Sequence, residues 1–167
     1  MNWMAATAAF LCSAAIGFQA ASKRTRRLRA LQTLVLLLQR MLLEMGFAHV
    51  PLPDMLFALR AQPPFASSPF LLRCTAAMDE GQRLCDAWNA GVQALQTLLQ
   101  PWEKTHLLQL GAVLGTTDLD GQTCAMEKTL EVLRQSLLDW QKQSKSGASL
   151  CRICGLCAGC VLFIMIL

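Results

Sequence analysis

The stretch that decides the fold is residues 3–46, which read WMAATAAFLCSAAIGFQAASKRTRRLRALQTLVLLLQRMLLEMG. Residues 3–21 are apolar or small and carry no charge, and a dense basic run follows them directly. Beyond that run, apolar residues recur at alternating spacings of three and four, as on one face of a helix: Leu28, Leu31, Val35, Leu38, Leu42 and Met45. Because no proline interrupts the stretch, it predicts one long helix, first in a membrane and then in water.

The composition supports membrane segments at both ends. The chain has 167 residues, of which 54% are hydrophobic, a high fraction for a protein that lies wholly in water. The mean hydropathy is +0.38, and the apolar excess gathers in residues 3–21 and 153–167. We therefore expect an N-terminal transmembrane helix over residues 1–22, a domain over 23–148, and a C-terminal transmembrane segment over 149–167. The last segment is short for an untilted span.

Basic residues predict how these segments are oriented. Positive charge beside a membrane segment favours the cytoplasmic side, whereas a cleaved signal peptide carries its charge ahead of the apolar stretch. We therefore expect a two-pass protein of the cell membrane with both termini outside and the domain in the cytoplasm. A nucleic-acid partner is not expected, because no aromatic residue lies among the basic residues. The orienting residues are Lys23, Arg24, Arg26, Arg27, Arg29 and Arg152.

The domain itself reads as all-α. Residues Met126, Leu130, Leu133, Leu137 and Trp140 repeat the spacing of the first helix, which predicts that the two helices pair antiparallel. A cap at Thr117 or Asp118 opens this last helix, and the polar residues 141–152 are expected to form a flexible connection. The sequence therefore predicts an antiparallel bundle of about six helices between the two membrane segments. The other expected helices are 54–61, 69–79 with a Ser68 cap, 82–99 and 102–114.

Four cysteines near the C-terminus offer the most tempting chemistry. Cys151, Cys154, Cys157 and Cys160 lie three residues apart, a spacing similar to that of iron–sulfur ligands. In an apolar helix with glycine and alanine between them, the same spacing gives one stripe of small residues that suits close transmembrane packing. We favour the packing stripe. A membrane redox or metal-binding protein is the alternative, and lipidation of Cys151 or disulfide chemistry also stays open.

No other pattern predicts catalysis. The two histidines, His49 and His106, lack a nearby nucleophile or carboxylate pattern, and the glycines Gly111 and Gly115 lack the lysine of a phosphate-binding loop. We therefore expect a protein that is not an enzyme and that has no cofactor, metal or small-molecule substrate.

Three blocks of the sequence resemble the stage III sporulation protein AB family. They are Pro51-Leu-Pro-Asp-Met-Leu, Gly81 with Ala87-Trp88, and the long block that begins at Leu107. The most specific part is L-x-L-G-x-x-L-G-x-x-D-x-x-x-Q, at Leu108–Gln122. With the two apolar ends, the resemblance covers the whole chain, although the cysteine stripe is not part of the family pattern.

The resemblance implies a membrane protein of endospore-forming Firmicutes, in the mother-cell membrane that faces the forespore. The family belongs to the stage III sporulation channel complex, and its cytoplasmic domain is similar to the F-domain of type II secretion and type IV pilus platform proteins. Those F-domains couple a cytoplasmic ATPase to the membrane assembly. The implied partners are therefore the membrane, the sporulation ATPase and other stage III channel proteins, and a homo-oligomer is compatible with this role.

We expect the ATPase contact on polar loops at the end of the bundle far from the membrane. Besides Ser67–Ser68, the candidates lie in residues 50–54 and 116–120, on either side of helix ends. They are Pro51, Pro53, Asp54, Thr116, Thr117, Asp118 and Asp120.

Overall fold

The computed structural model describes the backbone of residues 2–47 and 50–166 and the side chains of residues 22–46 and 50–142. Within these ranges the chain is all-helical, with six helices and no strand, which confirms the predicted class. The helices are α1 (Asn2–Phe47), α2 (Leu52–Arg60), α3 (Pro69–Asp79), α4 (Leu84–Ala94), α5 (Pro101–Val113) and α6 (Leu119–Ile166).

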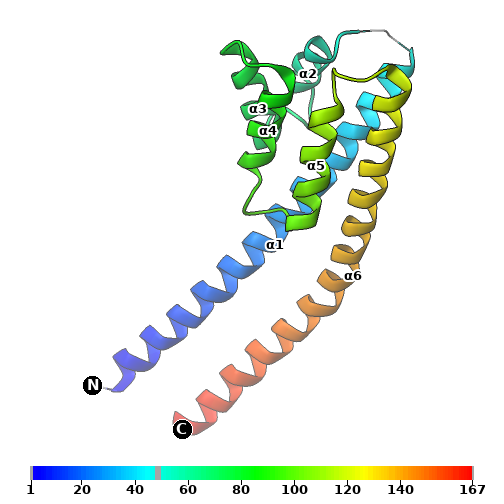
Figure 1. Cartoon of the computed structure of the whole chain (residues 1–167). Coiled ribbons are helices and arrows are strands. Elements are labelled where there is room, and N and C mark those ends of the chain that lie inside the picture. Colours follow the sequence, from blue (N-terminus) through cyan, green and yellow to red (C-terminus); the bar gives the residue numbers. More distant parts are fainter. Residues whose placement is uncertain (1, 48–49, 167) are drawn as a thin grey trace.

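The two longest helices, α1 and α6, run antiparallel beside each other, so that the start of α1 and the end of α6 lie at one end of the molecule (Figure 1). The short helices α2 to α5 gather around the opposite part of this pair, where α3 packs on α4 and α5 packs on both α4 and α6. We call the part of the bundle nearest the termini the terminal end, with residues 22–29, 95–102 and 136–142. The opposite part is the distal end, with residues 43–46, 50–54 and 114–121.

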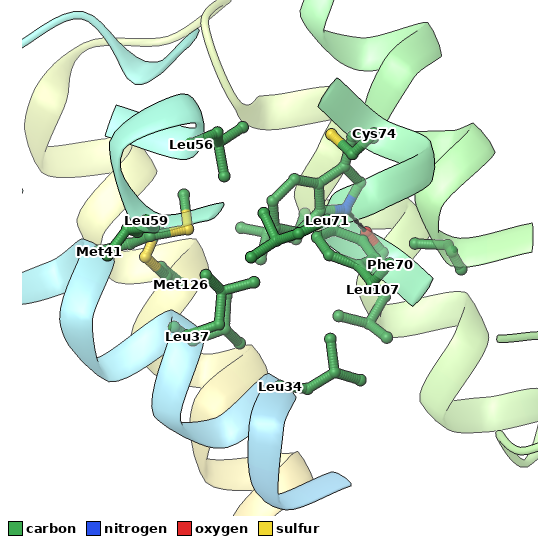
Figure 2. Packing of buried hydrophobic residues seen from close by; sticks show 14 of the residues in the cluster. Leu34, Leu37, Met41, Leu56, Leu59, Phe70, Leu71, Cys74, Leu107 and Met126 are labelled. Carbon is green, nitrogen blue, oxygen red and sulfur yellow. Dashed lines mark hydrogen bonds between the residues drawn. The ribbon is translucent and has the colours of Figure 1, made fainter. Parts of the chain in front are cut away.

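The predicted seam between the first and last helices is confirmed. Leu31 and Leu38 of α1 and Leu133 of α6 are fully buried. The buried stripe of α1 is wider than the seam, because α1 contacts α2 as well as α6. Figure 2 shows Met41 of α1 close to Met126 of α6. Burial of such apolar side chains is the main term that stabilises the bundle.

A buried tryptophan organises the packing of α3, α4 and α5. The Trp88 ring of α4 meets the edge of Phe70 of α3, with ring centroids 4.8 Å apart and planes at 79°. Its Nε1 donates a hydrogen bond of 2.8 Å to the backbone oxygen of Leu107 in α5. A Cβ on Gly111 would lie 2.4 Å from Trp88 Cδ1, so only glycine leaves room for the ring. This explains one glycine of the long block at Leu108–Gln122.

The structure corrects three local expectations. Helix α4 ends at Ala94 instead of Leu99, and turns cover residues 95–99. Ser68 precedes α3 but makes no side-chain capping bond. Residues 141–152 are not a flexible connection, because α6 continues through them. Glutamine and lysine are good helix formers, and one glycine in this segment does not suffice to end a long helix.

The side chains of the two expected membrane segments, 1–22 and 149–167, lie outside the described side chains except for residue 22. Across the side chains that the structure does describe, no helix contains an apolar stretch long enough to cross a membrane.

Candidate functional site

The distal end carries a well-ordered acidic turn between α5 and α6. Gly115 has a φ of +79°, a backbone conformation that glycine adopts without strain, and it reverses the chain after α5. The hydroxyls of Thr116 and Thr117 donate bonds of 2.9 Å to the backbone oxygens of Ala112 and Val113. These two threonines therefore satisfy the carboxyl end of α5 and hold the turn in one conformation.

The second half of this turn presents the acids to solvent. Gln122 Nε2 donates a bond of 2.7 Å to the backbone oxygen of Thr117, which ties the start of α6 to the turn. Asp118, Leu119 and Asp120 are all exposed, and the Leu119 side chain shows 48% of its surface. The result is a hydrogen-bonded turn in which the exposed Leu119 follows one exposed carboxylate and precedes another along the chain.

The predicted contact residues at the start of α2 lie at the same end of the bundle as this turn (Figure 1). Pro51, Pro53 and Asp54 are exposed, whereas the following Met55 and Leu56 are buried in the core. Two prolines fix the start of α2, because their φ angles are set before the helix forms. The structure therefore brings both predicted loops to one end of the molecule.

The third predicted loop, Ser67–Ser68, does not lie at the distal end with the start of α2 and the α5–α6 turn. Ser67 and Ser68 line a groove together with Arg26 and Arg29 of α1 and Leu98 near the end of α4. This places the serine pair on the half of the bundle nearer the termini, so it does not lie at the distal end with the other two predicted loops. The sequence could not show this, because the groove combines three segments that are far apart along the chain.

The basic residues of α1 separate into two groups. Lys23, Arg24, Arg26 and Arg29 are exposed at the terminal end. Arg27 instead turns inward and shows only 9% of its surface. Arg152, the remaining orienting residue, lies outside the described side chains.

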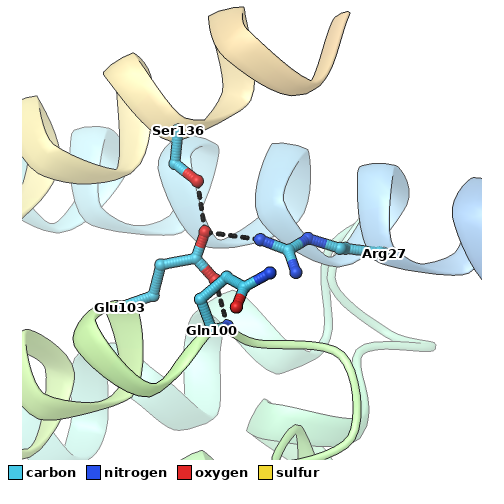
Figure 3. A network of polar contacts seen from close by, with 4 residues as sticks. All are labelled: Arg27, Gln100, Glu103 and Ser136. Atoms are coloured by element: carbon cyan, nitrogen blue, oxygen red, sulfur yellow. Dashed lines mark hydrogen bonds and ion pairs between the residues drawn. The ribbon is translucent and has the colours of Figure 1, made fainter. Parts of the chain in front are cut away.

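Arg27 belongs to a buried polar cluster that joins three helices (Figure 3). Its Nη2 lies 2.9 Å from Oε1 of Glu103 in α5, which is fully buried. The Ser136 hydroxyl of α6 donates to the same carboxylate oxygen, and the backbone N–H of Gln100 donates to Oε2 at 2.6 Å. The guanidinium also stacks 4.3 Å from the ring centroid of Trp140 in α6. We call Arg27, Gln100, Glu103, Ser136 and Trp140 the buried polar cluster.

In this cluster, both the Glu103 carboxylate and the Arg27 guanidinium have interaction partners. The Glu103 carboxylate accepts three hydrogen bonds, and a cation–π contact covers the arginine. Among the fully buried side-chain nitrogen and oxygen atoms that the structure describes in this cluster, Nε of Arg27 alone has no hydrogen-bond partner. A buried ion pair of this kind fixes how its helices are placed, because the loss of either partner leaves an uncompensated charge.

This cluster is absent from the sequence-based predictions, although its residues carry a positional signal. Arg27 lies four residues before Leu31, and Glu103 lies four residues before Leu107 on the apolar face of α5. Ser136 falls between Leu133 and Trp140 in the same way. A charged residue in phase with an apolar stripe is a candidate for a buried pair.

The described cysteines are not arranged as a metal site. Cys74 is buried, Cys85 is half-buried and Cys124 is exposed. Among residues with described side chains, no cluster of histidines, cysteines and acids is placed to hold a metal ion. The stripe Cys151, Cys154, Cys157 and Cys160 lies outside this part of the chain, so both of its interpretations remain predictions.

Burial should make Cys74 unreactive in the native bundle. It raises the pKa of the thiol from its ordinary 9.0 to about 12. At about pH 8 the exposed Cys124 should react with iodoacetamide at least about ten times faster than Cys74, as measured for each peptide by mass spectrometry. The folded-state pKa is raised, so this thiol's contribution to stability is complete below pH 9 and is lost between pH 9 and about 12. Equal labelling of both thiols in the folded chain would contradict the burial of Cys74.

The family model described as stage III sporulation protein AB matches residues 2–167. A solved structure titled stage III sporulation protein AB (SpoIIIAB) superposes with a TM-score of 0.58 at 22% identity, and the match covers 72% of this chain and 98% of that one. At this identity the likeness supports the fold alone. The curated proteins contain no match. The family match spans nearly every residue, and the chain therefore belongs to the stage III sporulation protein AB family.

Proposed function

We propose that this chain is a non-enzymatic platform component of the stage III sporulation channel complex. In this proposal, residues 1–22 and 149–167 anchor it in the mother-cell membrane with both termini outside. The bundle hangs in the cytoplasm, where its distal end binds the sporulation ATPase and couples that enzyme to the membrane assembly. Family membership supports the place in sporulation, whereas the anchoring and the ATPase contact are proposals.

One observation carries the proposal. Helices α1 and α6 pair along the bundle and both continue past it at the same end, so both apolar segments of the sequence extend from one side (Figure 1). A bundle held in this way has one end near its anchors and one end free. The predicted contact residues of α2 and of the α5–α6 turn lie at the free end.

The distal end has the properties of a small recognition surface. Asp118 and Asp120 carry negative charge, and the half-exposed Leu119 between them offers an apolar contact. The bonds of Thr116 and Thr117 already order the turn, so binding costs little conformational entropy. A partner that fits this surface presents basic residues around an apolar pocket.

The buried polar cluster gives the bundle a stiff link between its two ends. Helix α5 leads directly into the acidic turn, and Glu103 at its other end is bound to α1 and α6. Force applied at the turn therefore reaches both anchoring helices through packed elements. A component that couples an ATPase to a membrane assembly needs this property.

The Asp118→Lys/Asp120→Lys variant should lose its affinity for the ATPase. Both side chains are exposed, so the fold should survive, while a cationic turn would repel a basic partner surface. We expect binding of the full chain in nanodiscs to weaken by about ten-fold or more, measured by biolayer interferometry with the ATPase of the same organism.

The matched control is Glu131→Lys/Asp139→Lys, which makes the same charge change on exposed positions along α6. This control should bind like the parent chain. Equal weakening by both variants would mean that net charge alone governs binding. Undiminished binding by the first variant would reject the acidic turn as the contact.

A further inference from the structure

A groove on the half of the bundle nearer the termini is lined by basic, polar and apolar residues that the proposed function does not use. It has a volume of about 720 Å³ and lies between α1, the segment before α3 and the end of α4. Its floor and walls include Ala30, Leu36, Pro64, Leu95 and Leu98, which give it an apolar body.

The charged residues that line the groove are both basic. Arg26 and Arg29 stand one helical turn apart on α1, and neither guanidinium has an ion-pair partner within the described residues. The set of lining residues contains no aspartate or glutamate. Two unpaired arginines on one wall therefore make a local positive field that nothing in the groove neutralises.

Ser68 is a second, independent observation that the groove suits an anion. Its side chain is only 7% exposed, lines the groove and makes no capping bond at the start of α3. No hydrogen bond of its hydroxyl occurs among the described residues, so this largely buried residue leaves a donor available to the groove. The amino end of α3 begins at the next residue, Pro69, and adds the positive partial charge of a helix N-terminus.

An anionic phospholipid combines the two properties that the groove requires. Its phosphate matches the arginines and the serine hydroxyl, and its glycerol and upper acyl carbons match the apolar lining. A free phosphate or a sulfate would leave that lining uncovered. The surroundings also suit a lipid surface, because Lys23, Arg24 and the 47%-exposed Trp102 lie at the terminal end.

We infer that the groove between Arg26, Arg29 and Ser68 binds the headgroup of an anionic phospholipid and seats the bundle against the membrane surface. The inference rests on the membrane anchoring in the proposed function and adds a specific lipid contact to it. Because α1 carries both arginines and also pairs with α6, a bound lipid would fix the tilt of the whole bundle relative to the bilayer.

The test uses the full chain, extracted in mild detergent after reconstitution in vesicles of phosphatidylcholine with phosphatidylglycerol. Native mass spectrometry then counts the retained lipids. The parent chain should retain phosphatidylglycerol in preference to phosphatidylcholine. The Arg26→Gln/Arg29→Gln variant should retain at most about one tenth as much phosphatidylglycerol as the parent. The charge-matched control Arg73→Gln/Arg134→Gln removes two exposed arginines elsewhere and should behave like the parent.

Equal retention by Arg26→Gln/Arg29→Gln and the parent would overturn the inference, and so would displacement of the lipid by inorganic phosphate alone. Carbonate extraction of the parent chain distinguishes failure of the lipid site from failure of the membrane anchoring in the proposed function. A chain that stays in the carbonate-washed membrane but shows no lipid preference retains its anchors and lacks the lipid site. A chain that carbonate releases refutes both.

Discussion

The Gly111→Ala variant should unfold at a clearly lower temperature than the parent chain. The added Cβ would lie 2.4 Å from Trp88 Cδ1 and 3.0 Å from Cγ, well inside contact distance. The ring cannot retreat, because Trp88 is fully buried, bonded to the Leu107 oxygen and packed edge-on against Phe70. We expect a loss of about 3 kcal/mol in the free energy of unfolding, at the upper end of the range for overpacked cores.

Thermal unfolding of the full chain in detergent, followed by tryptophan fluorescence, measures this loss. Gly46→Ala is the matched control, because a Cβ there meets nothing within 4 Å and the residue lies in a helix. That variant should be as stable as the parent or slightly more stable, by about 0.5–1 kcal/mol. Equal stability of Gly111→Ala and the parent would show that the α4–α5 contact is looser than described.

The Glu103→Leu variant should lose about 3–5 kcal/mol of stability, because Arg27 then remains buried without its counter-charge. The Ser136 hydroxyl and the Gln100 N–H lose their acceptor in the same step. Since small domains are stable by only about 5–15 kcal/mol, this change removes a large part of the total. Denaturant unfolding of the full chain measures the difference.

Two comparisons show whether the loss comes from the unpaired charge. The double variant Arg27→Met/Glu103→Leu should recover part of the stability, because no charge is left in the interior. Glu44→Ala breaks the more exposed ion pair with Arg40 and should cost less than about 1 kcal/mol. A Glu103→Leu variant no weaker than Glu44→Ala would mean that the buried polar cluster contributes little to the fold.

The sequence predicted the framework of this protein well, for a physical reason. A seam such as Leu31, Leu38 and Leu133 depends only on helical periodicity and burial, which a single sequence shows directly. Prolines and Gly115 marked the breaks between helices, and they do so through their own backbone preferences. The pairing of α1 with α6 followed from two seams of equal period.

The contacts that depend on several segments at once could not be predicted in the same way. The position of Arg27 in phase with the apolar face of α1 marks it as a candidate for burial, but the sequence does not show that its partner is Glu103, which lies 76 residues away. The position of Ser67–Ser68 depends on how the segment before α3 lies beside α1 and the end of α4. The prediction of a flexible connection over residues 141–152 was wrong because it relied on their polarity. Polar residues such as lysine and glutamine also continue helices.

In the proposed function, the bundle has one end for the membrane and one end for the ATPase. Site-specific photocrosslinking tests it in the full chain reconstituted in nanodiscs with the ATPase. A crosslinker at Leu119, exposed at the distal end, should capture the ATPase, and one at Thr97, exposed at the terminal end, should capture lipid instead. Capture of the ATPase from Thr97 and none from Leu119 would show that the distal end is not the ATPase contact.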